Sequence, residues 1–424
     1  MKVLVIGNGA REHAMAWKLA QSSKVQRVYV APGNGGTASD PALVNVPITD
    51  LAALADFAAQ EKIALTVVGP EAPLAAGVVD LFRGRGLRIF GPTRAAAQLE
   101  SSKAFAKDFM QRHGIPTAHY AVFTEAVAAH AHVTQHGAPI VIKADGLAAG
   151  KGVVVATTKD EAHAAIDFML ADNSGPSRVV IEEFMAGEEA SFIVVADGKH
   201  ALALATSQDH KRIGDGDTGP NTGGMGAYSP APVVTPTVHA RVMREVILPT
   251  IVGMAADGHP FSGFLYAGLM IDSDGKARVV EFNARLGDPE AQVLLMRLKS
   301  DLYELLMSAT DAQRGGVRDI ELQWDRRSAL GVVMASAGYP ASPRLGDAIT
   351  GLPASSEDMH VFHAATTKNA SGALVTSGGR VLTVTALGDP LRVAQQRAYA
   401  ALEPIRFDGM QWRRDIGHRA LKAR

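Results

Sequence analysis

The first 95 residues alternate between short apolar runs and longer stretches with helical periodicity. Each apolar run has four or five residues and ends near glycine or proline, as in "KVLVIG" and "LTVVGP". Such runs are typical of strands buried on both faces of a parallel sheet, and the stretches between them supply crossover helices. The pattern predicts strands at 2–7, 25–34, 65–70 and 87–92, and helices at 11–23, 51–63 and 72–86.

The pattern changes in the next hundred residues. A helix beginning near residue 97 is predicted to end before Gly114. From 117 to about 200, strand patterns alternate with glycine-rich turns around one helix at 160–170. The stretch "PIVIKADGLAAGKGVVVAT" is typical of strand, loop and strand, and "RVVIEEFMAGEEASFIVVADG" repeats this order with a tighter connection. We expect a small α+β unit inserted here.

The stretch "DTGPNTGGMGAYSP", residues 217–230, contains four glycines and two prolines. This composition suits neither a helix nor an ordinary strand, so we expect an irregular loop. Next, the pattern predicts a helix at 237–257 that is interrupted at Pro249. Two strands, "FLYAGLMID" and "ARVVEFNAR", are expected after it.

The last hundred residues form a further predicted unit. Residues 310–327 are polar and irregular, which indicates a domain boundary. The chain beyond them is rich in short strand patterns and ends in a predicted helix. We expect Asp389 to be the N-cap of that helix and Pro390 its first residue.

Composition narrows the class of protein. The 424 residues are too many for one hydrophobic core, so two or three domains are expected. The formal net charge of −1 gives no long-range field that would attract nucleic acid or an acidic membrane surface. Cysteine is absent from the sequence, which excludes thiol nucleophiles, cysteine-ligated metals and disulfides. With no long apolar run, these features fit a cytoplasmic protein.

The N-terminal stretch "VLVIGNGAREHA" matches the G-x-G-x-x-G motif only in part. Gly7 and Gly9 occupy its first two positions, but the third falls on Glu12. The second strand ends in Ala31-Pro32 where an acid would bind ribose, so a nicotinamide cofactor is disfavoured. A phosphate could still bind at the helix N-terminus, where Arg11 would suit it. The alternative is a tight turn with a solvated Arg11.

The stretch "DGLAAGKGV" differs from a P-loop. Asp145 stands where the first glycine is required, Gly152 replaces Ser or Thr, and a strand follows instead of a helix. A glycine-rich loop between strands can close over a polyphosphate, with backbone N–H groups and Lys151 as donors. Lys143, at the end of the preceding apolar strand, would need an anionic partner. The alternative is a plain hairpin turn with a solvated lysine.

Two carboxylate-bearing stretches suggest nucleotide and metal binding. In "VVIEEFMAGEEASF", an apolar strand leads into a polar turn that could meet an adenine edge, and a later carboxylate could bind ribose. In "VVEFNARLGDPE", alternation along a strand places Glu281, Asn283 and Arg285 on one face. These groups suit Mg²⁺ and phosphate, and the alternative is a surface ion pair. The fourteen histidines show no zinc-site spacing.

Together these motifs resemble the ATP-grasp enzymes and, more closely, the phosphoribosylamine–glycine ligase family of purine biosynthesis. The resemblance extends over almost the whole chain. It rests on nine stretches in order: "GNGAREHA", "VVGPEAPLAAGVVD", "IFGPT", "IVIKADGLAAGKGV", "EEFMAGEEASF", "TSQDHKR", "DTGPNTGGMGAYSP", "GFLYAGLMID" and "EFNARLGDPE". It implies ATP-dependent ligation of glycine to 5-phosphoribosylamine through glycyl phosphate, which needs no protein nucleophile.

The resemblance also implies the domains. They are an N-terminal Rossmann-like domain at 1–100 (the pre-ATP-grasp domain), an ATP-grasp domain at 101–325 with a small α+β lid at 117–192, and a C-terminal α+β domain at 326–424. The expected fold class is therefore α/β and α+β, multidomain. The implied cofactors are ATP and Mg²⁺ or Mn²⁺. The partners would be glycine and 5-phosphoribosylamine alone, with no nucleic acid or membrane, and the protein would be a monomer.

The roles of single residues follow from the same resemblance. Arg285 would stabilise the transferring phosphoryl group, and Glu281 and Asn283 would bind the metal. Residues expected to bind ATP are Lys103, Lys143, Gly146, Gly150, Lys151, Gly152, Glu182, Glu183, Phe184, Met185 and Glu189. Residues expected to bind the other substrates are Gly9, Arg11, Asp209, Asn221, Thr222, Gly223 and Gly224.

Three other interpretations stay open at this point. One is another purine-pathway ATP-grasp ligase that uses bicarbonate or formate. A second is a nucleotide-binding module without catalytic activity, which the intact lysines and the Glu281–Asn283–Arg285 face disfavour. The third is the nicotinamide oxidoreductase, which the incomplete glycine motif disfavours.

Overall fold

The computed structural model describes residues 1–147, 152–171 and 177–422. Its N-terminal part is a parallel sheet of order β3-β2-β1-β4-β5, as the apolar runs predict. The strands are β1 (Lys2–Gly7), β2 (Arg27–Pro32), β3 (Leu43–Asn45), β4 (Leu65–Val68) and β5 (Ile89–Phe90). The helices are α1 (Ala10–Leu19), α2 (Leu51–Gln60), α3 (Glu71–Ala75) and α4 (Val78–Gly84). The pattern missed β3, a three-residue edge strand in which only Leu43 is buried.

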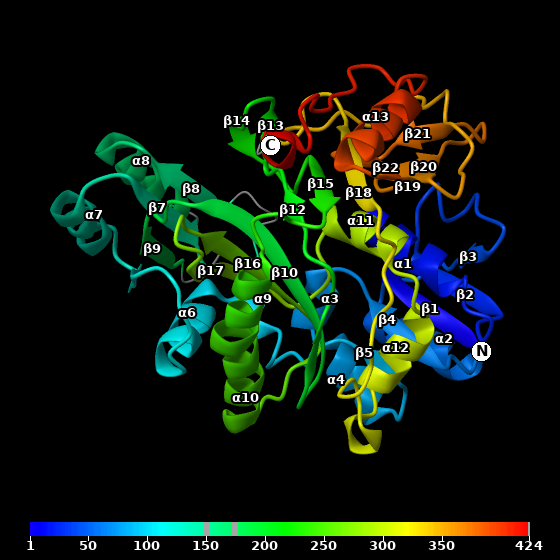
Figure 1. Cartoon of the computed structure of the whole chain (residues 1–424), viewed down its shortest axis with the longest axis horizontal. Coiled ribbons are helices and arrows are strands. Elements are labelled where there is room, and N and C mark those ends of the chain that lie inside the picture. Colours follow the sequence, from blue (N-terminus) through cyan, green and yellow to red (C-terminus); the bar gives the residue numbers. More distant parts are fainter. Residues whose placement is uncertain (148–151, 172–176, 423–424) are drawn as a thin grey trace.

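A second sheet, of order β11-β10-β16-β17, crosses the middle of the molecule (Figure 1). It comprises β10 (Glu188–Asp197), β11 (Ala201–Ala203), β16 (Ser262–Ile271) and β17 (Ala277–Asn283). Helices α5 (Gln98–Ser101) and α6 (Lys103–Arg112) precede it in the chain. Antiparallel pairing of β10 with β16 runs from Glu188 opposite Ile271 to Asp197 opposite Ser262. These two long strands form the frame on which the central site is built.

The helix expected at 237–257 is divided in three. A π-helical turn, η1 (Met243–Ile247), lies between α9 (Pro236–Val242) and α10 (Leu248–Ala256). Pro249 is the second residue of α10 and cannot donate the N–H that would continue the hydrogen-bond ladder from η1. The interruption therefore precedes the proline, as a wider turn, instead of falling on it.

The small α+β unit is a four-stranded sheet of order β6-β9-β7-β8 with two helices. Its elements are β6 (Tyr120–Phe123), α7 (Ala126–His136), β7 (Ile140–Ala144), β8 (Val153–Ala156), α8 (Lys159–Leu170) and β9 (Val179–Glu183). The predicted strand, turn and strand at 178–198 are present as β9 and β10, but only β9 belongs to the small unit, because it pairs with β6 and β7 whereas β10 pairs in the central sheet. The chain passes from one sheet to the other within 184–187.

The C-terminal sheet has the order β12-β15-β18-β22-β19. Its strands are β12 (Gln208–Asp209), β15 (Gly226–Ser229), β18 (Ser328–Ala335), β19 (Met359–His363) and β22 (Arg380–Gly388). A hairpin of β20 (Thr366–Lys368) and β21 (Leu374–Thr376) extends from it, and α13 (Leu391–Leu402) packs on it. That helix begins one residue later than expected, with Pro390 at the N-cap position.

The glycine-rich stretch 217–230 contains two strands, so the expectation of an irregular loop is wrong. One is β14 (Thr218–Asn221), paired with β13 (Arg212–Gly214), and the other is the fully buried β15. A Cβ on Gly226 would lie 2.7 Å from the carbonyl oxygen of Gly331 on β18. Glycine here permits close approach of two strands, so β15 joins the C-terminal sheet to the middle of the chain.

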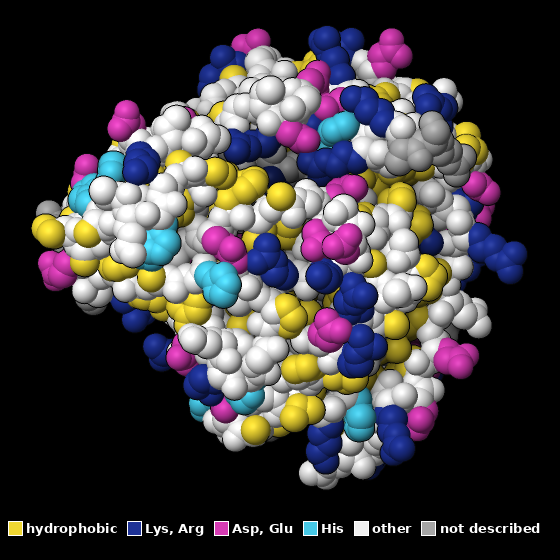
Figure 2. Space-filling model, turned by 60° about the vertical axis from the view of Figure 1, so that its left-hand side comes forward, with side chains coloured by type: hydrophobic (Ala, Val, Ile, Leu, Met, Phe, Trp, Pro, Cys, Tyr) yellow, Lys and Arg dark blue, Asp and Glu magenta, His cyan; other side chains and the backbone are white. Residues whose placement is uncertain are grey.

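Helix α11 (Glu290–Arg297) connects the three large parts. All its residues are buried, and it packs between α1 and the C-terminal sheet (Figure 1). The remaining helical elements are α12 (Leu302–Ala309), η2 (Ala312–Arg314) and α14 (His418–Lys422). On the face shown in Figure 2, basic and acidic side chains are interspersed, in agreement with the small net charge. Among the described residues, no helix is both long and apolar enough to cross a membrane.

Candidate active site

A cavity of about 620 Å³ lies where the N-terminal, central and C-terminal parts meet. Most of the residues singled out by their motifs line it: Gly9, Arg11, Lys103, Lys143, Gly146, Glu182, Asp209, Asn221, Thr222, Gly223, Glu281, Asn283 and Arg285. Others do not: Gly152, Glu183, Phe184, Met185, Glu189 and Gly224. Gly150 and Lys151 lie outside the described residues. Residues far apart in the sequence thus share one site.

Two buried lysines share one buried glutamate at one side of the cavity. Lys143 Nζ on β7 lies 2.9 Å from Glu182 Oε1 on β9, and Lys107 Nζ on α6 lies 3.0 Å from Glu182 Oε2. All three side chains are at most 5% exposed. Burial lowers the pKa of Lys107 to about 8. The solvated-lysine alternative for Lys143 is therefore wrong, and the Glu182 side chain is occupied by lysines.

The neighbours of Glu182 differ in their surroundings. Glu183 Oε1 accepts hydrogen bonds from the His119 amide at 3.0 Å and from Arg278 at 2.7 Å. Phe184 is 43% exposed, whereas Met185 is buried. Lys103, which also lines the cavity, donates from Nζ to the carbonyl oxygen of Gly146 at 2.8 Å.

Glu281, Asn283 and Arg285 all line the cavity, but Arg285 pairs with other carboxylates than Glu281, the partner that the surface ion-pair alternative requires. Arg285 Nη2 lies 2.8 Å from Glu100 Oε1, and Arg285 Nε lies 3.4 Å from Glu71 Oε2. Asn283 Oδ1 accepts a long hydrogen bond of 3.4 Å from Arg285. Arg285 is thus held by carboxylates of α3 and α5, and a solvated Glu281–Arg285 surface pair is not found among the described residues.

Glu281 and Asn283 suit a magnesium ion that is shared with phosphate. In the described part of the chain, no three His, Asp or Glu side chains are grouped as a metal site. One carboxylate and one amide oxygen match a hard cation that takes its remaining ligands from phosphate oxygens and water. Although burial opposes it, Lys211 lowers the pKa of Glu281, which keeps this carboxylate ionised.

A cluster of charged side chains lies beside Glu281, and the sequence analysis assigned roles to its members Asp209 and Glu189 but not to Lys211 or Glu290. Asp209 is buried on β12, and burial together with Glu290 raises its pKa to about 8. Lys211 lies 3.6 Å from Glu281 and also pairs with Glu189. Glu290 Oε1, at the start of α11, accepts a 2.9 Å hydrogen bond from Ser191. Lys211 and Glu290 fall inside the stretches "TSQDHKR" and "EFNARLGDPE", so the family resemblance could have identified both as candidate site residues.

The N-terminal loop holds a carboxylate where a phosphate was expected. Glu12 Oε2 accepts the Gly9 amide N–H at 2.7 Å, and Glu12 Oε1 lies 2.6 Å from Arg11 Nε. A Cβ on Gly69 would meet Glu12 Oε1 at 2.0 Å. The chain's own carboxylate thus takes the Gly9 amide at the helix N-terminus, and a phosphate at this position stays a prediction. Arg11 is buried and not solvated, and its Nη1 donates to Leu286 O at 3.1 Å.

The tip of the glycine-rich stretch is fixed by backbone contacts. Thr222 Oγ1 donates to the Lys211 carbonyl at 2.8 Å and accepts the Gly224 amide at 2.9 Å. Gly224 has a φ of 117°, and a Cβ there would lie 2.5 Å from Pro289 Cδ. Its glycine is thus required for packing. Arg380 Nη1 donates to the Gly223 carbonyl at 2.8 Å, which leaves the Thr222–Gly223 turn facing the cavity.

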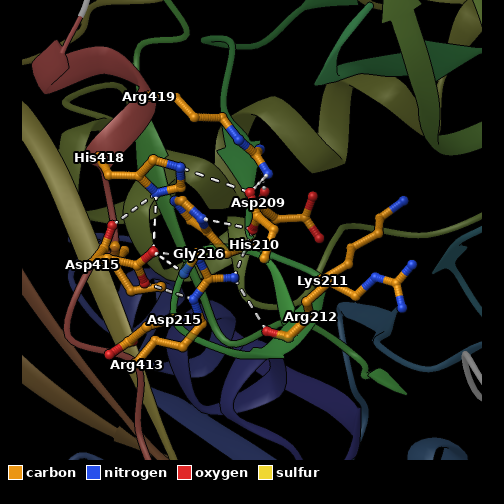
Figure 3. A network of polar contacts seen from close by, with 12 residues as sticks. Asp209, His210, Lys211, Arg212, Asp215, Gly216, Arg413, Asp415, His418 and Arg419 are labelled. Atoms are coloured by element: carbon orange, nitrogen blue, oxygen red, sulfur yellow. Dashed lines mark hydrogen bonds and ion pairs between the residues drawn. The ribbon is translucent and has the colours of Figure 1, made fainter. Parts of the chain in front are cut away.

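The turn of the β13–β14 hairpin, residues 215–217, is tied to the C-terminal segment (Figure 3). The fully buried Arg413 lies 2.8 Å from carboxylate oxygens of both Asp217 and Asp415. Arg419 Nη2 lies 2.8 Å from the second oxygen of Asp217. The Gly417 amide donates to His210 Nε2 at 3.0 Å. Segments about 200 residues apart are thus held together beside the residues that line the cavity.

This network predicts a stability effect. We expect Asp217→Asn to lower the free energy of unfolding by about 1–3 kcal/mol, because two guanidinium groups lose a charged partner. Urea denaturation measures this change. The control is Asp56→Asn, whose pair with Arg85 is 63% exposed on the aspartate side and should change stability by less than about 1 kcal/mol. Equal effects of the two substitutions would contradict the role assigned to this network.

Comparisons with known proteins cover the whole chain. Residues 1–100, 101–291 and 329–419 match the N domain, the ATP-grasp (A) domain and the C domain of phosphoribosylglycinamide synthetase. The phosphoribosylamine–glycine ligase of Ralstonia nicotianae is 68% identical over 100% of both chains. The enzyme of that name from Neisseria meningitidis serogroup A is 60% identical and covers 99% of this chain and 100% of its own.

Solved structures agree with the sequence relatives. A phosphoribosylamine–glycine ligase from Thermotoga maritima has a TM-score of 0.83 and 34% identity, covering 98% of this chain and 100% of its own. The biotin carboxylase domain of the Hydrogenobacter thermophilus 2-oxoglutarate carboxylase shares the fold, with a TM-score of 0.71, 16% identity and coverage of 97% and 91%. The expected multidomain α/β and α+β fold is confirmed. The chain belongs to the phosphoribosylglycinamide synthetase family of ATP-grasp ligases.

Proposed function

We propose that the central cavity joins glycine to 5-phosphoribosylamine, the reaction of the ligase family to which this chain belongs. The products are glycinamide ribonucleotide, ADP and phosphate, in de novo purine biosynthesis. One observation carries the proposal: Lys143 on β7, Asp209 on β12, Glu281 on β17 and Arg285 just beyond β17 converge on one cavity of about 620 Å³. The three other interpretations are set aside by the family relationship.

The chemistry explains why the site holds charged groups and no nucleophile. A glycine carboxylate oxygen attacks the γ-phosphorus of ATP and ADP leaves, which gives glycyl phosphate. The amine of phosphoribosylamine then attacks the carbonyl carbon, phosphate leaves, and the nitrogen loses one proton. Both steps depend on positioning and on stabilising negative charge, since no protein group needs to form a bond.

On the nucleotide side, the proposal assigns ATP to the lysine-rich wall of the cavity. Lys103, Lys143 and Gly146 would contact its phosphates, and Arg285 would stabilise the transferring phosphoryl group. Backbone groups of the 182–185 segment would meet the adenine edge, and Glu189 the ribose. Residues 150–152 stay predicted phosphate contacts.

The metal assignment rests on Glu281 and Asn283. The Hydrogenobacter thermophilus biotin carboxylase domain of the same fold is described in complex with MgADP. A bound Mg²⁺ would neutralise phosphate charge, and Mn²⁺, with similar oxygen preference, should replace it. In this chain Glu281 and Asn283 would hold the ion next to the phosphates of ATP, at the end of β17.

On the acceptor side, buried acids face the backbone of the glycine-rich turn. Asp209 could hold an ammonium group or accept the proton released by the amine, because its raised pKa lies near neutral pH. Asn221, Thr222 and Gly223 would contact glycine and the sugar amine through backbone and side-chain groups. Arg11 and Gly9 complete this side of the cavity. We expect a monomeric cytoplasmic enzyme that acts on small molecules alone.

The test is ADP release from Mg-ATP with glycine and phosphoribosylamine, generated from ribose 5-phosphate and ammonia. Each component is omitted in turn, and the product is identified by mass spectrometry. ADP should appear only in the complete mixture, together with glycinamide ribonucleotide. ADP release that ignores glycine would indicate another acceptor and would overturn the assignment of residues 221–223.

A substitution at the metal face gives a separate prediction. We expect Glu281→Gln to raise the Mg²⁺ concentration needed for half-maximal activity by about tenfold or more, with a smaller change in the KM for glycine. A magnesium titration at saturating ATP and glycine measures this. The reverse order, with glycine affinity more affected, would remove Glu281 from the metal site.

A further inference from the structure

One acid of the central cavity, Asp209, belongs to a short stretch, residues 209–212, whose other side lies outside the cavity. Asp209 is buried and lines the cavity, whereas the next residue, His210, is fully buried and does not line it. Asp209 ends β12, and neighbouring side chains of an extended chain point to opposite faces, which explains this difference. The position of the Asp209 carboxylate therefore depends on what packs behind this stretch.

The C-terminal segment, residues 413–419, packs behind residues 209–212 (Figure 3). The Gly417 amide donates to His210 Nε2 at 3.0 Å. Burial lowers the pKa of His210 to about 4, so the ring is neutral and Nε2 can accept this bond. The His210 amide in turn donates to the Gly226 carbonyl at 2.9 Å. The middle of the stretch is thus held by β15 and by the C-terminal segment.

Two arginines of the C-terminal segment hold the ends of the same stretch. Arg419 Nη1 donates to the Asp209 carbonyl at 3.3 Å, and Arg413 Nη1 donates to the Arg212 carbonyl at 3.2 Å. Each guanidinium also lies 2.8 Å from a carboxylate oxygen of Asp217, in the turn of the hairpin. A guanidinium that is fixed by a carboxylate presents its remaining N–H groups in a set direction. Arg419 is therefore a bridge between Asp217 and the backbone of Asp209.

We propose that Arg419 is a positioning residue, which fixes the place of the Asp209 carboxylate in the central cavity through this bridge. Arg419 does not line the cavity, so it acts through the backbone of Asp209 without touching a substrate. The inference rests on the proposed function, because it takes Asp209 to act on glycine or phosphoribosylamine. It gives the C-terminal segment, which belongs to none of the sequence motifs, a part in the reaction.

Steady-state kinetics of Arg419→Met test this role. The substitution keeps the aliphatic stem of a side chain that is 26% exposed and removes the guanidinium that binds Asp217 and Asp209. We expect the KM for glycine, for phosphoribosylamine or for both to rise about tenfold, and the KM for ATP to change by less than about twofold. Arg419→Lys keeps the charge without the planar fork and should raise the same KM values by less. A role in folding alone would instead lower kcat and leave all three KM values unchanged, which would overturn the proposal.

The matched control is Arg414→Met. Arg414 is exposed in the same segment, and its backbone amide, which the substitution keeps, donates to Asp215 at 2.8 Å. None of the three KM values should change. A rise equal to that of Arg419→Met would mean that any charge lost from this segment has the same effect, and it would contradict the bridge.

A double variant shows whether Asp217 and Arg419 act together. Arg419→Met combined with Asp217→Asn should raise the KM values no more than the more affected single variant, because Asp217 acts on Asp209 through Arg419. Effects that multiply would show that the two residues act independently, and the bridge would be wrong.

Hydrogen–deuterium exchange without substrates gives a readout that does not depend on the reaction. The Met225 amide donates to the His210 carbonyl at 2.8 Å, and the Thr222 amide donates to the Lys211 carbonyl at 2.7 Å. Arg419→Met should speed the exchange of these amides and leave the amides of α7 unchanged. Unchanged exchange would overturn the positioning role even in an active enzyme, whereas absence of glycine-dependent ADP release by the wild type would refute the proposed function. The two failures are therefore distinguishable.

Discussion

Substitution of Arg285 by alanine should lower kcat for glycine-dependent ADP release by on the order of 10³. The guanidinium lines the central cavity next to Asn283, and Glu100 and Glu71 fix its orientation. Although burial opposes it, these carboxylates raise the pKa of Arg285. A charge that is already oriented before the reaction stabilises the transferring phosphoryl group without reorganisation, so its removal should affect kcat more than KM.

The control for this substitution is Arg241→Ala. Arg241 donates to the Gly275 carbonyl at 2.6 Å, in the turn between β16 and β17, and does not line the central cavity. Its loss should change kcat by less than about threefold. Thermal unfolding of both variants shows whether the fold is kept. A loss of only a few-fold for a folded Arg285→Ala protein would remove Arg285 from the phosphoryl-transfer site.

The sequence predicts best those features that depend on local periodicity. Parallel strands β1, β2, β4 and β5 follow from apolar runs, because burial on both faces leaves a continuous signal. β15 was missed, because glycines that permit close strand approach also resemble those of a loop. β10 was placed in the wrong sheet, since periodicity indicates a strand but does not specify its partner.

The site was predictable as a set of residues, but not as a set of contacts. Alternation along β17 places Glu281 and Asn283 on one face, whereas the Glu71 and Glu100 partners of Arg285 lie far away in the sequence. Glu12 shows the same limit, since only the folded loop places its carboxylate on the Gly9 amide.

Substitution of Glu182 by glutamine should lower the free energy of unfolding at pH 7 by about 3–5 kcal/mol. The carboxylate is the shared counter-ion of Lys107 and Lys143, and all three side chains are nearly inaccessible to water. Glutamine keeps the shape but leaves two buried ammonium groups without a negative partner. Glu183→Gln is the control on the same strand: its carboxylate is 36% exposed and pairs with Arg278, so about 1 kcal/mol or less is expected.

The loss of stability in Glu182→Gln should depend on pH if it comes from lost charge pairing, but not if it comes from lost packing. The pKa of Lys107 in the folded protein, about 8, lies below its unfolded value of about 10.4. Between these values the unfolded chain binds more protons, so stability rises with pH. Removing Glu182 lowers the folded pKa of Lys107 further, so the variant begins to regain stability at a lower pH than the wild type. The difference in unfolding free energy between the wild type and Glu182→Gln should therefore narrow by about 1 kcal/mol between pH 7 and pH 9. Urea denaturation at the two pH values measures it. A difference that is constant over this range would mean that Glu182 contributes through packing alone.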